Sequence, residues 1–228
     1  MSERLRRMRE EDRGFTLVEL LIAMGIFGLL MALVFNLLIE MMYQSNDNLA
    51  RTRAVEQARL GISQIDRQIR SGNVILDPAM ENPANAGLAA SETYYSLRVY
   101  TQEDGGDMCV QWRVLFPDAA SEYGSLQFRE WEAGDPSSVT SWANVANNVV
   151  AATGTPDLDD PETWPPFWVD TSLSADARTT AQRIRITLRM GDPSAREDAK
   201  PATVSSVVTG RNTVFQYSAL HCADVPAA

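Results

Sequence analysis

Twenty consecutive residues without a charged side chain, Leu20 to Ile39, constrain the fold of this chain more than any other feature. Only Gly25, Gly28 and Asn36 interrupt their apolar character, and only weakly. An α-helix rises about 1.5 Å per residue, so the run would span roughly 30 Å, the thickness of the hydrocarbon core of a bilayer. The sequence therefore predicts a membrane-spanning helix close to the N-terminus.

The charges on either side of this run predict its orientation. Five arginines lie within residues 1–14, whereas the whole chain has a net charge of −10. By the positive-inside rule, we expect the N-terminus in the cytoplasm and everything from about Tyr43 onward outside a single-pass inner-membrane anchor. A secretory signal has a shorter apolar region, about 7–15 residues, and a small-residue cleavage site after it. No such site follows Ile39, so we expect the helix to stay in the mature protein.

Glu19 places a carboxylate at the start of the apolar run. Thr16 and Glu19 have the spacing of a capping box, in which the two residues satisfy each other's backbone amides at a helix N-terminus. The positive end of the helix dipole also favours a carboxylate there. These local effects are worth about 0.3–2 kcal/mol, and a charged side chain at the bilayer centre costs at least about 2.5 kcal/mol. Capping can therefore explain Glu19 only if it lies at the membrane interface.

The surrounding residues carry a more specific signal. Residues 13–23, RGFTLVELLIA, closely resemble the processing site of type IV prepilins and of type II secretion pseudopilins. The resemblance implies that a membrane prepilin peptidase cuts after Gly14 and methylates the new N-terminus at Phe15. It also implies that Glu19 neutralises the terminal amine of a neighbouring subunit during assembly, which would compensate a buried carboxylate.

The same resemblance implies the partners of the chain. They are other pilin or pseudopilin subunits, the prepilin peptidase, the membrane assembly platform and the inner membrane. A cofactor and an enzymatic activity are not implied, and the negative net charge argues against nucleic acid as a general partner.

Beyond the apolar run, the pattern becomes amphipathic. Val55, Ala58, Ile62, Ile65 and Ile69 recur at intervals of three and four residues, and Gly72-Asn73 is a good helix stop. We therefore predict one helix over residues 15–71. Its first half would be the membrane anchor and filament core, and its second half would pack on a globular head.

Strand signals dominate the rest of the chain. We predict strands at 95–100, 108–116, 125–131, 183–189, 203–209 and 213–217, the first two forming a hairpin around 103–107. In 183–189, Ile184, Ile186 and Leu188 would point inward and the arginines outward. Residues 74–93 and 151–166 read as loops, and 139–149 as a short helix. The fold class is α+β, an antiparallel sheet packed on the C-terminal half of the long helix, as in the pilin fold.

Cys109 and Cys222 are the only cysteines, and both would lie in an oxidising compartment. A disulfide between them would tie the C-terminal tail to the second strand. Two separate free thiols are the alternative.

Other candidate chemistry is weak. His221 is the only histidine, but its neighbour Cys222 would point to the opposite face of a strand, so a shared catalytic or metal site is not expected. Four acidic residues of the 157–162 loop could gather calcium, although their spacing fits no EF-hand: Asp157, Asp159, Asp160 and Glu162. Arg183, Arg185 and Arg189 could touch DNA, but no interleaved aromatic residues accompany them for base stacking.

These observations divide the chain into four parts. We expect a leader (1–14), an anchor (15–42), an amphipathic helical half (43–72) and an extracytoplasmic head (73–228). Removal of the leader would leave 214 of the 228 residues, which is large for a major pilin and similar to minor subunits such as J-type pseudopilins or PilW-like pilins. Such subunits form a tip complex that primes assembly. The alternatives are an anchored binding protein that does not polymerise, an anchored exoenzyme and a DNA-uptake pseudopilin.

Overall fold

The computed structural model describes residues 15–103, 105–118, 120–169, 181–196, 199–215 and 217–227. The chain forms two compact units, Met1–Asn46 and Asp47–Ala228. One helix, α2 (Leu17–Ser71), begins in the first unit and ends in the second. The predicted helix over 15–71 is therefore confirmed, with its first residue, Leu17, two positions later than expected.

The second half of α2 buries one face in the head. Ala58, Ile62, Ile65 and Ile69 are all buried, as their spacing predicts, and Val55 is partly buried. Small residues lie before and within this row of buried side chains, and they allow the helix to approach the sheet closely. At Gly61, a Cβ atom would lie only 2.8 Å from the Cδ2 of Leu126, so the absence of a side chain permits the contact.

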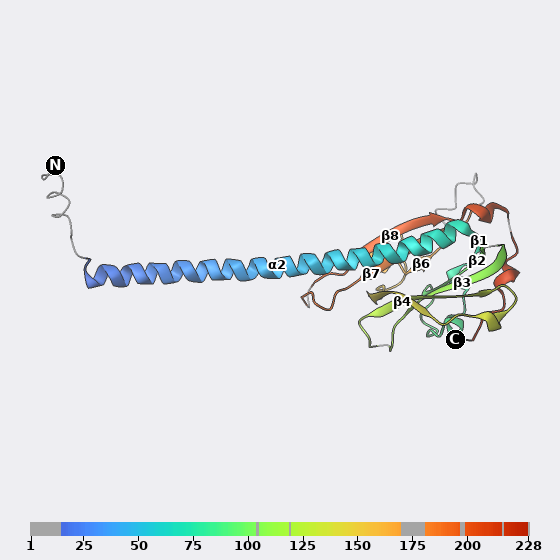
Figure 1. The fold of residues 1–228 in the computed structure, drawn as a ribbon, viewed down its shortest axis with the longest axis horizontal. Coiled ribbons are helices and arrows are strands. Elements are labelled where there is room, and N and C mark those ends of the chain that lie inside the picture. The colour runs from blue at the N-terminus through green and yellow to red at the C-terminus, as the bar shows by residue number, and fades with distance from the viewer. Residues whose placement is uncertain are drawn as a thin grey trace. The chain divides into compact units, whose positions relative to one another are not determined.

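An antiparallel sheet packs against α2 in the head. Among the described residues, its eight strands are β1 (Gly72–Ile75), β2 (Ser96–Glu103), β3 (Gly106–Leu115), β4 (Gly124–Glu132), β5 (Ala143–Val149), β6 (Phe167–Trp168), β7 (Arg183–Met190) and β8 (Ala202–Thr209). The strand order is β1-β2-β3-β4-β5-β7-β6, and β8 pairs with β7 along its full length. Figure 1 shows β7 and β8 alongside the second half of α2.

Most predicted strands are present. The hairpin of β2 and β3 pairs from Ser96 opposite Arg113 to Glu103 opposite Gly106. The inward side chains of β7 are fully buried, as predicted for Ile184, Ile186 and Leu188. The 151–166 segment contains only the short 3-10 helix η4 (Pro161–Thr163) and an isolated bridge, so its assignment as mainly irregular is also confirmed. The α+β fold class is therefore correct.

The predicted helix within 139–149 is wrong, because this segment contains strand β5. Its pairing with β4 skips Val145 and Asn148, the latter with a left-handed φ of 62°. These irregularities break the two-residue alternation of a strand. As a result, Trp142, Val145 and Val149 show the spacing of a helix in the sequence.

Two further assignments need correction. Val74 and Ile75 belong to β1, which pairs with β2, so the predicted loop at 74–93 begins too early. Residues 213–215 lie in a 3-10 helix, η6 (Arg211–Phe215), instead of a strand. The Thr213 hydroxyl donates to the Gly210 carbonyl at 2.6 Å, and this local bond favours a turn over extension.

Candidate functional site

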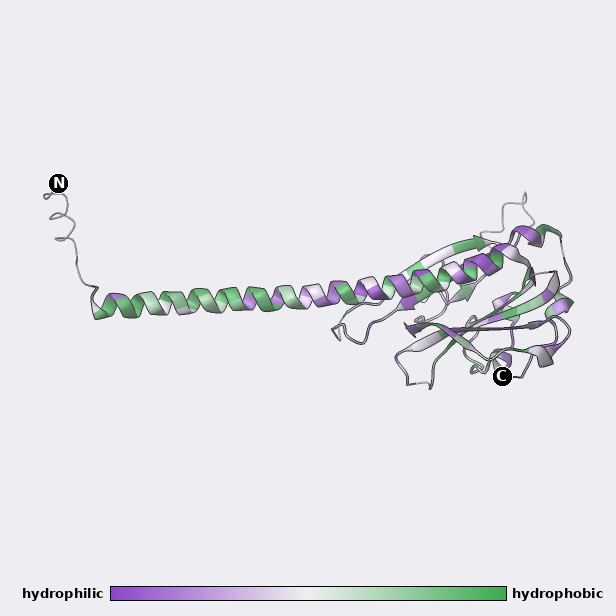
Figure 2. Cartoon of the chain, viewed as in Figure 1, coloured by the Kyte–Doolittle hydropathy of each residue, from purple (hydrophilic) through white to green (hydrophobic). Residues whose placement is uncertain are grey.

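The described residues from Phe15 to Ile39 form an apolar helix surface that no other described part of the head covers. All of them are exposed, and an 18-residue window of α2 has a mean hydropathy of 2.6 with none of it buried. Figure 2 shows hydrophobic residues around the first half of α2 and mixed polarity along the second half. By length and composition, this helix could cross a membrane.

The start of the helix is a complete capping box. The Thr16 amide nitrogen and the Thr16 hydroxyl each donate to Oε2 of Glu19 over 2.9 Å, and the Glu19 amide donates to the Thr16 hydroxyl over 3.3 Å. The side chain of Phe15, immediately before it, is 86% exposed. Gly14, the other residue of the predicted cleavage site, lies outside the described residues.

The helix surface between the two flanking carboxylates is open. Glu19 and Glu40 bound the uncharged run, and Gln44 donates to the Glu40 carboxylate at 3.5 Å. Apart from the adjoining residues and the backbone of the helix itself, no described atom lies within 4 Å of the position that a Cβ would take at Gly25 or Gly28. Small residues of this kind allow another helix to approach closely in a membrane or a bundle.

Comparison with known proteins identifies this segment. Residues 11–35 match the model of the prokaryotic N-terminal methylation motif. No curated protein and no solved structure matches the chain. The N-terminal segment therefore combines a motif that supports a type IV pilin-like protein with an apolar helix long enough to anchor the chain in a membrane.

In the head, a disulfide joins the two cysteines. Cys109 of β3 and Cys222 of the 3-10 helix η7 (Ala219–Cys222) are linked, with their Cα atoms 5.8 Å apart. Both cysteines are fully buried and pack in a small cluster with Val74, Tyr100 and Trp131. The bond fixes the C-terminal segment to the face of the sheet opposite α2.

The structure does not assemble the other predicted chemical sites. Among the described residues, no group of three or more histidine, cysteine or acidic side chains could hold a metal ion. In the 157–162 loop, the Asp157 carboxylate accepts a hydrogen bond from the Asp159 backbone amide, and the Asp160 carboxylate accepts one from the Glu162 amide. Both carboxylates therefore cap local turns. His221 stacks on Tyr100, with ring centroids 4.6 Å apart.

The outer face of β7 differs from its prediction in two respects. Arg189 is buried and donates to the Pro161 carbonyl, so it is not part of an exposed basic face. The Arg185 guanidinium lies 3.8 Å from the ring centroid of Trp164 and 5.6 Å from that of Trp168. Aromatic residues from distant positions therefore do accompany this arginine, but they stack on it as cation–π partners.

Sequence reasoning missed three buried arginines on the sheet face opposite α2. Arg98 forms an ion pair of 2.7 Å with Glu81, and burial raises the pKa of Glu81 despite this partner. Arg113 and Arg129 lie 3.9 Å and 4.5 Å from the ring centroid of Trp142. Burial, together with the nearby Arg129, lowers the pKa of Arg113 to about 10.

These arginines hold the segments that cover the sheet. Arg129 donates to the carbonyls of Pro226 and Ala227 in the C-terminal segment, and Arg113 donates to the Ala86 carbonyl. Arg98 donates to the Cys222 carbonyl at 2.6 Å. Their role in the structure is therefore to fix the cover of the sheet, beside the disulfide.

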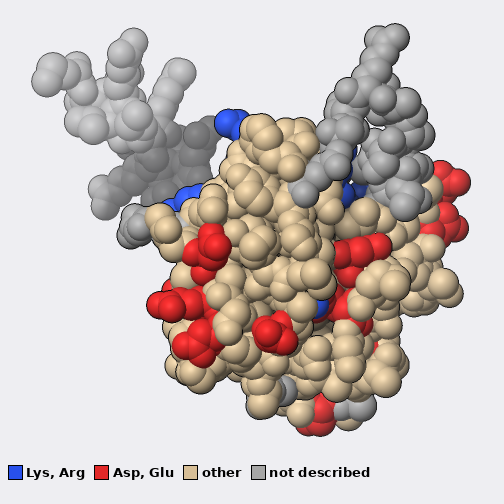
Figure 3. Space-filling view, turned by 90° about the vertical axis from the view of Figure 1, so that its right-hand side faces the viewer, with Lys and Arg blue, Asp and Glu red and all other residues tan. Residues whose placement is uncertain are grey.

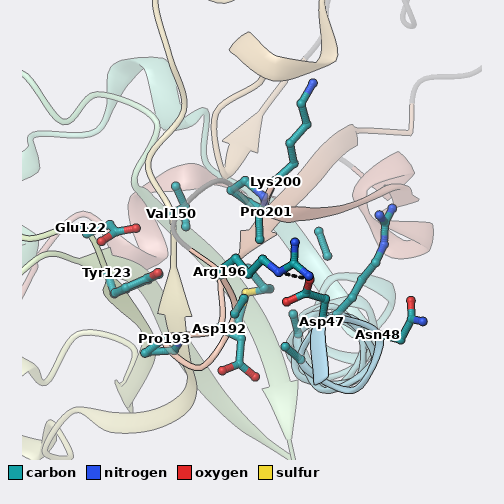
Figure 4. Close-up of a pocket in the computed structure, with 18 residues that line it drawn as sticks. Asp47, Asn48, Glu122, Tyr123, Val150, Asp192, Pro193, Arg196, Lys200 and Pro201 are labelled. Carbon is teal, nitrogen blue, oxygen red and sulfur yellow. Dashed lines mark ion pairs between the residues drawn. The ribbon is translucent and has the colours of Figure 1, made fainter. Parts of the chain in front are cut away.

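A groove of about 600 Å³ lies beside the first residues of α2 within the head. Figure 4 shows Asp47 of α2 and Arg196 of the β7–β8 loop pointing toward each other across it, in an ion pair of 3.2 Å. A second pair, Arg53 with Asp192, joins the same two elements at 3.9 Å. Exposed pairs of this kind contribute little individually, but together they position the loop against the helix.

Proposed function

We propose that this chain is a minor pilin or pseudopilin, a structural subunit of a type IV pilus or a type II secretion pseudopilus. The observation that carries the proposal is the motif match over residues 11–35, at the start of a helix whose apolar window is fully exposed in this structure. A helix that is apolar on all sides requires a membrane or other helices around it. A pilin subunit would use the same apolar surface twice, first against the membrane and then against the helices of neighbouring subunits.

The assembly site in this proposal is the helix N-terminus. Prepilin peptidase would remove residues 1–14 after Gly14 and methylate Phe15, and Glu19 would then pair with the amine of a neighbouring subunit. The exposed position of Phe15 beside the capping box supports access to this end. The anchor would be residues 15–42, with residues 43–72 and the 73–228 head outside the cytoplasm.

A place in the tip or priming complex is the finer part of the proposal. The head unit, Asp47–Ala228, is large for a major pilin. Glu19 is present, whereas the subunit at the very top of a tip complex lacks this carboxylate, so the chain would sit on other subunits of its kind. The assembly platform in the inner membrane would add it to the complex.

Co-purification from native membranes tests this proposal. The chain should be captured by a tag inserted in an exposed head loop, from cells with and without prepilin peptidase. We expect other proteins that carry the same N-terminal motif to co-purify only when the peptidase is present. Processing without any motif-bearing partner would favour an anchored binding protein that does not polymerise, and would contradict the proposal.

A further inference from the structure

The head exposes a compact apolar surface at the end of the unit where α2 stops. We call it the distal patch and define it by four residues of η6, η7 and the segment between them: Val214, Phe215, Tyr217 and Leu220. Phe215 is 71% exposed and Leu220 is 79% exposed. Asn212, near the start of η6, donates to the Ser71 carbonyl at 3.2 Å, which places η6 beside the last residue of α2.

Ring contacts and the disulfide connect the distal patch to the rest of the head. Phe215 meets Tyr217 edge-on at 6.4 Å, and Tyr217 meets the buried Tyr100 edge-on at 6.2 Å between ring centroids. Immediately after Leu220 and His221, Cys222 is fixed to β3 by the disulfide. Large apolar side chains that are exposed and already ordered lose little conformational entropy when a partner covers them. Clustered exposure of this kind is typical of an interaction surface.

The charged groups at this end of the head are mainly acidic (Figure 3), and Arg211 at the start of η6 is an exposed basic exception. Figure 3, which looks onto this end of the head, shows acidic side chains on both sides of an uncharged area and fewer basic ones. Asp107 lies near the patch, because its carboxylate is hydrogen-bonded to Tyr100, which contacts Tyr217, and it also accepts a hydrogen bond from Gln102 at 2.9 Å. Hydrogen bonds from Gln102 and Tyr100 lower the pKa of Asp107, so its carboxylate is ionised at neutral pH.

We propose that the distal patch docks a different protein, one whose contact surface is apolar at its centre and carries Lys or Arg at its rim. A second copy of this chain fits less well, because it would bring the same carboxylates against each other. An anionic membrane surface is disfavoured for the same reason. The proposal requires only that the head is folded and accessible, so it is independent of cleavage at Gly14 and of pairing by Glu19.

Site-specific photocross-linking in the native organism tests this inference. A benzophenone amino acid is placed at Phe215 or Leu220, and at Leu60 as the control, a residue of α2 that is 63% exposed. We expect positions 215 and 220 to form an adduct with another protein, mapped to a segment with apolar residues beside Lys or Arg. Adducts with a second copy or with lipid alone, or none above the Leu60 background, would overturn the proposal.

Matched substitutions sharpen the test. Truncation of a central aromatic side chain commonly weakens binding at an interface about 10- to 30-fold. When the concentration of the partner limits binding, Phe215→Ser should therefore lower the yield of the position 220 adduct by about that factor. Leu60→Ser should leave it unchanged. Asp107→Asn should lower the yield less, and added salt should remove this difference. Equal effects of Phe215→Ser and Leu60→Ser would contradict a specific surface, provided that the melting temperature of the head is unaltered.

Discussion

Oε2 of Glu19 lies 2.9 Å from both the backbone nitrogen and the hydroxyl oxygen of Thr16. Within a single chain, the carboxylate therefore already has a local structural role at the helix start. Glutamine can serve in the same capping box. A role of Glu19 in pairing with a neighbouring amine would need its negative charge, which glutamine lacks, so the two roles can be separated by one substitution.

Glu19→Gln should retain the helix and lose assembly. If the carboxylate compensates the amine of a neighbouring subunit, removing one side of that buried pair costs about 3–5 kcal/mol. This corresponds to roughly two to four decades in an association constant. We expect normal cleavage at Gly14, a normally folded head and loss of co-purifying subunits, measured by quantitative mass spectrometry of the captured complex.

Glu40→Gln is the matched control, because Glu40 bounds the other end of the uncharged run. It should leave the complex intact. Complex formation by Glu19→Gln at the level of the unsubstituted chain would show that the capping box is the whole role of Glu19.

The disulfide should stabilise the head substantially. The closed loop spans 113 residues of sequence, and removal of a native disulfide commonly costs about 2–5 kcal/mol. We expect no titratable thiol in the folded, unreduced protein, and a lower free energy of unfolding for the Cys109→Ser, Cys222→Ser double variant. Thiol titration and denaturant unfolding measure the two quantities. Two free thiols in the unreduced protein would refute the bridge.

The buried pair of Glu81 and Arg98 should make stability depend on pH. Arg98 contacts Oε1 of Glu81, whereas Oε2 is buried without a hydrogen-bond partner among the described residues. Burial raises the pKa of Glu81 above its ordinary value of 4.5. The native state therefore binds more protons than the unfolded state between the two pKa values, and this group's stabilising contribution is lost as pH rises through the native pKa.

The comparison with Glu81→Gln isolates this effect. The free energy of unfolding of the unsubstituted head, minus that of the variant, should fall as pH rises from below 4.5. Urea unfolding over a pH series measures this difference. An increase over the same interval would mean that Arg98 lowers the pKa of Glu81 more than burial raises it.

Local patterns predicted the helix and most strands because each pattern reports on a single element. The stripe from Ala58 to Ile69 and the alternation of Ile184, Ile186 and Leu188 persist in the structure, since each repeats one regular backbone period. In β5 the irregular pairing at Val145 and Asn148 removed the period and produced the wrong assignment. The capping box of Thr16 and Glu19 was predictable because it involves residues only three apart.

The polar face of the sheet was not predictable, because its contacts join distant residues. Arg129 reaches Pro226 and Ala227, nearly 100 positions away, and Arg185 meets Trp164 only because β6 pairs with β7. An arginine in an alternating strand is normally exposed to solvent, and nothing in the local sequence indicates that another segment will cover it. The distal patch was missed for another reason, because three of its residues, Val214, Phe215 and Tyr217, fell within the predicted strand at 213–217.

The native N-terminus tests the central claim most directly. The protein should be extracted from membranes of the native organism with an active prepilin peptidase, digested, and its N-terminal peptide analysed by mass spectrometry. We predict that the chain begins at N-methylated Phe15, and that the same peptide is absent when the peptidase gene is deleted. Recovery of residues 1–14 still joined to Phe15 in the presence of the active peptidase would contradict the pilin account.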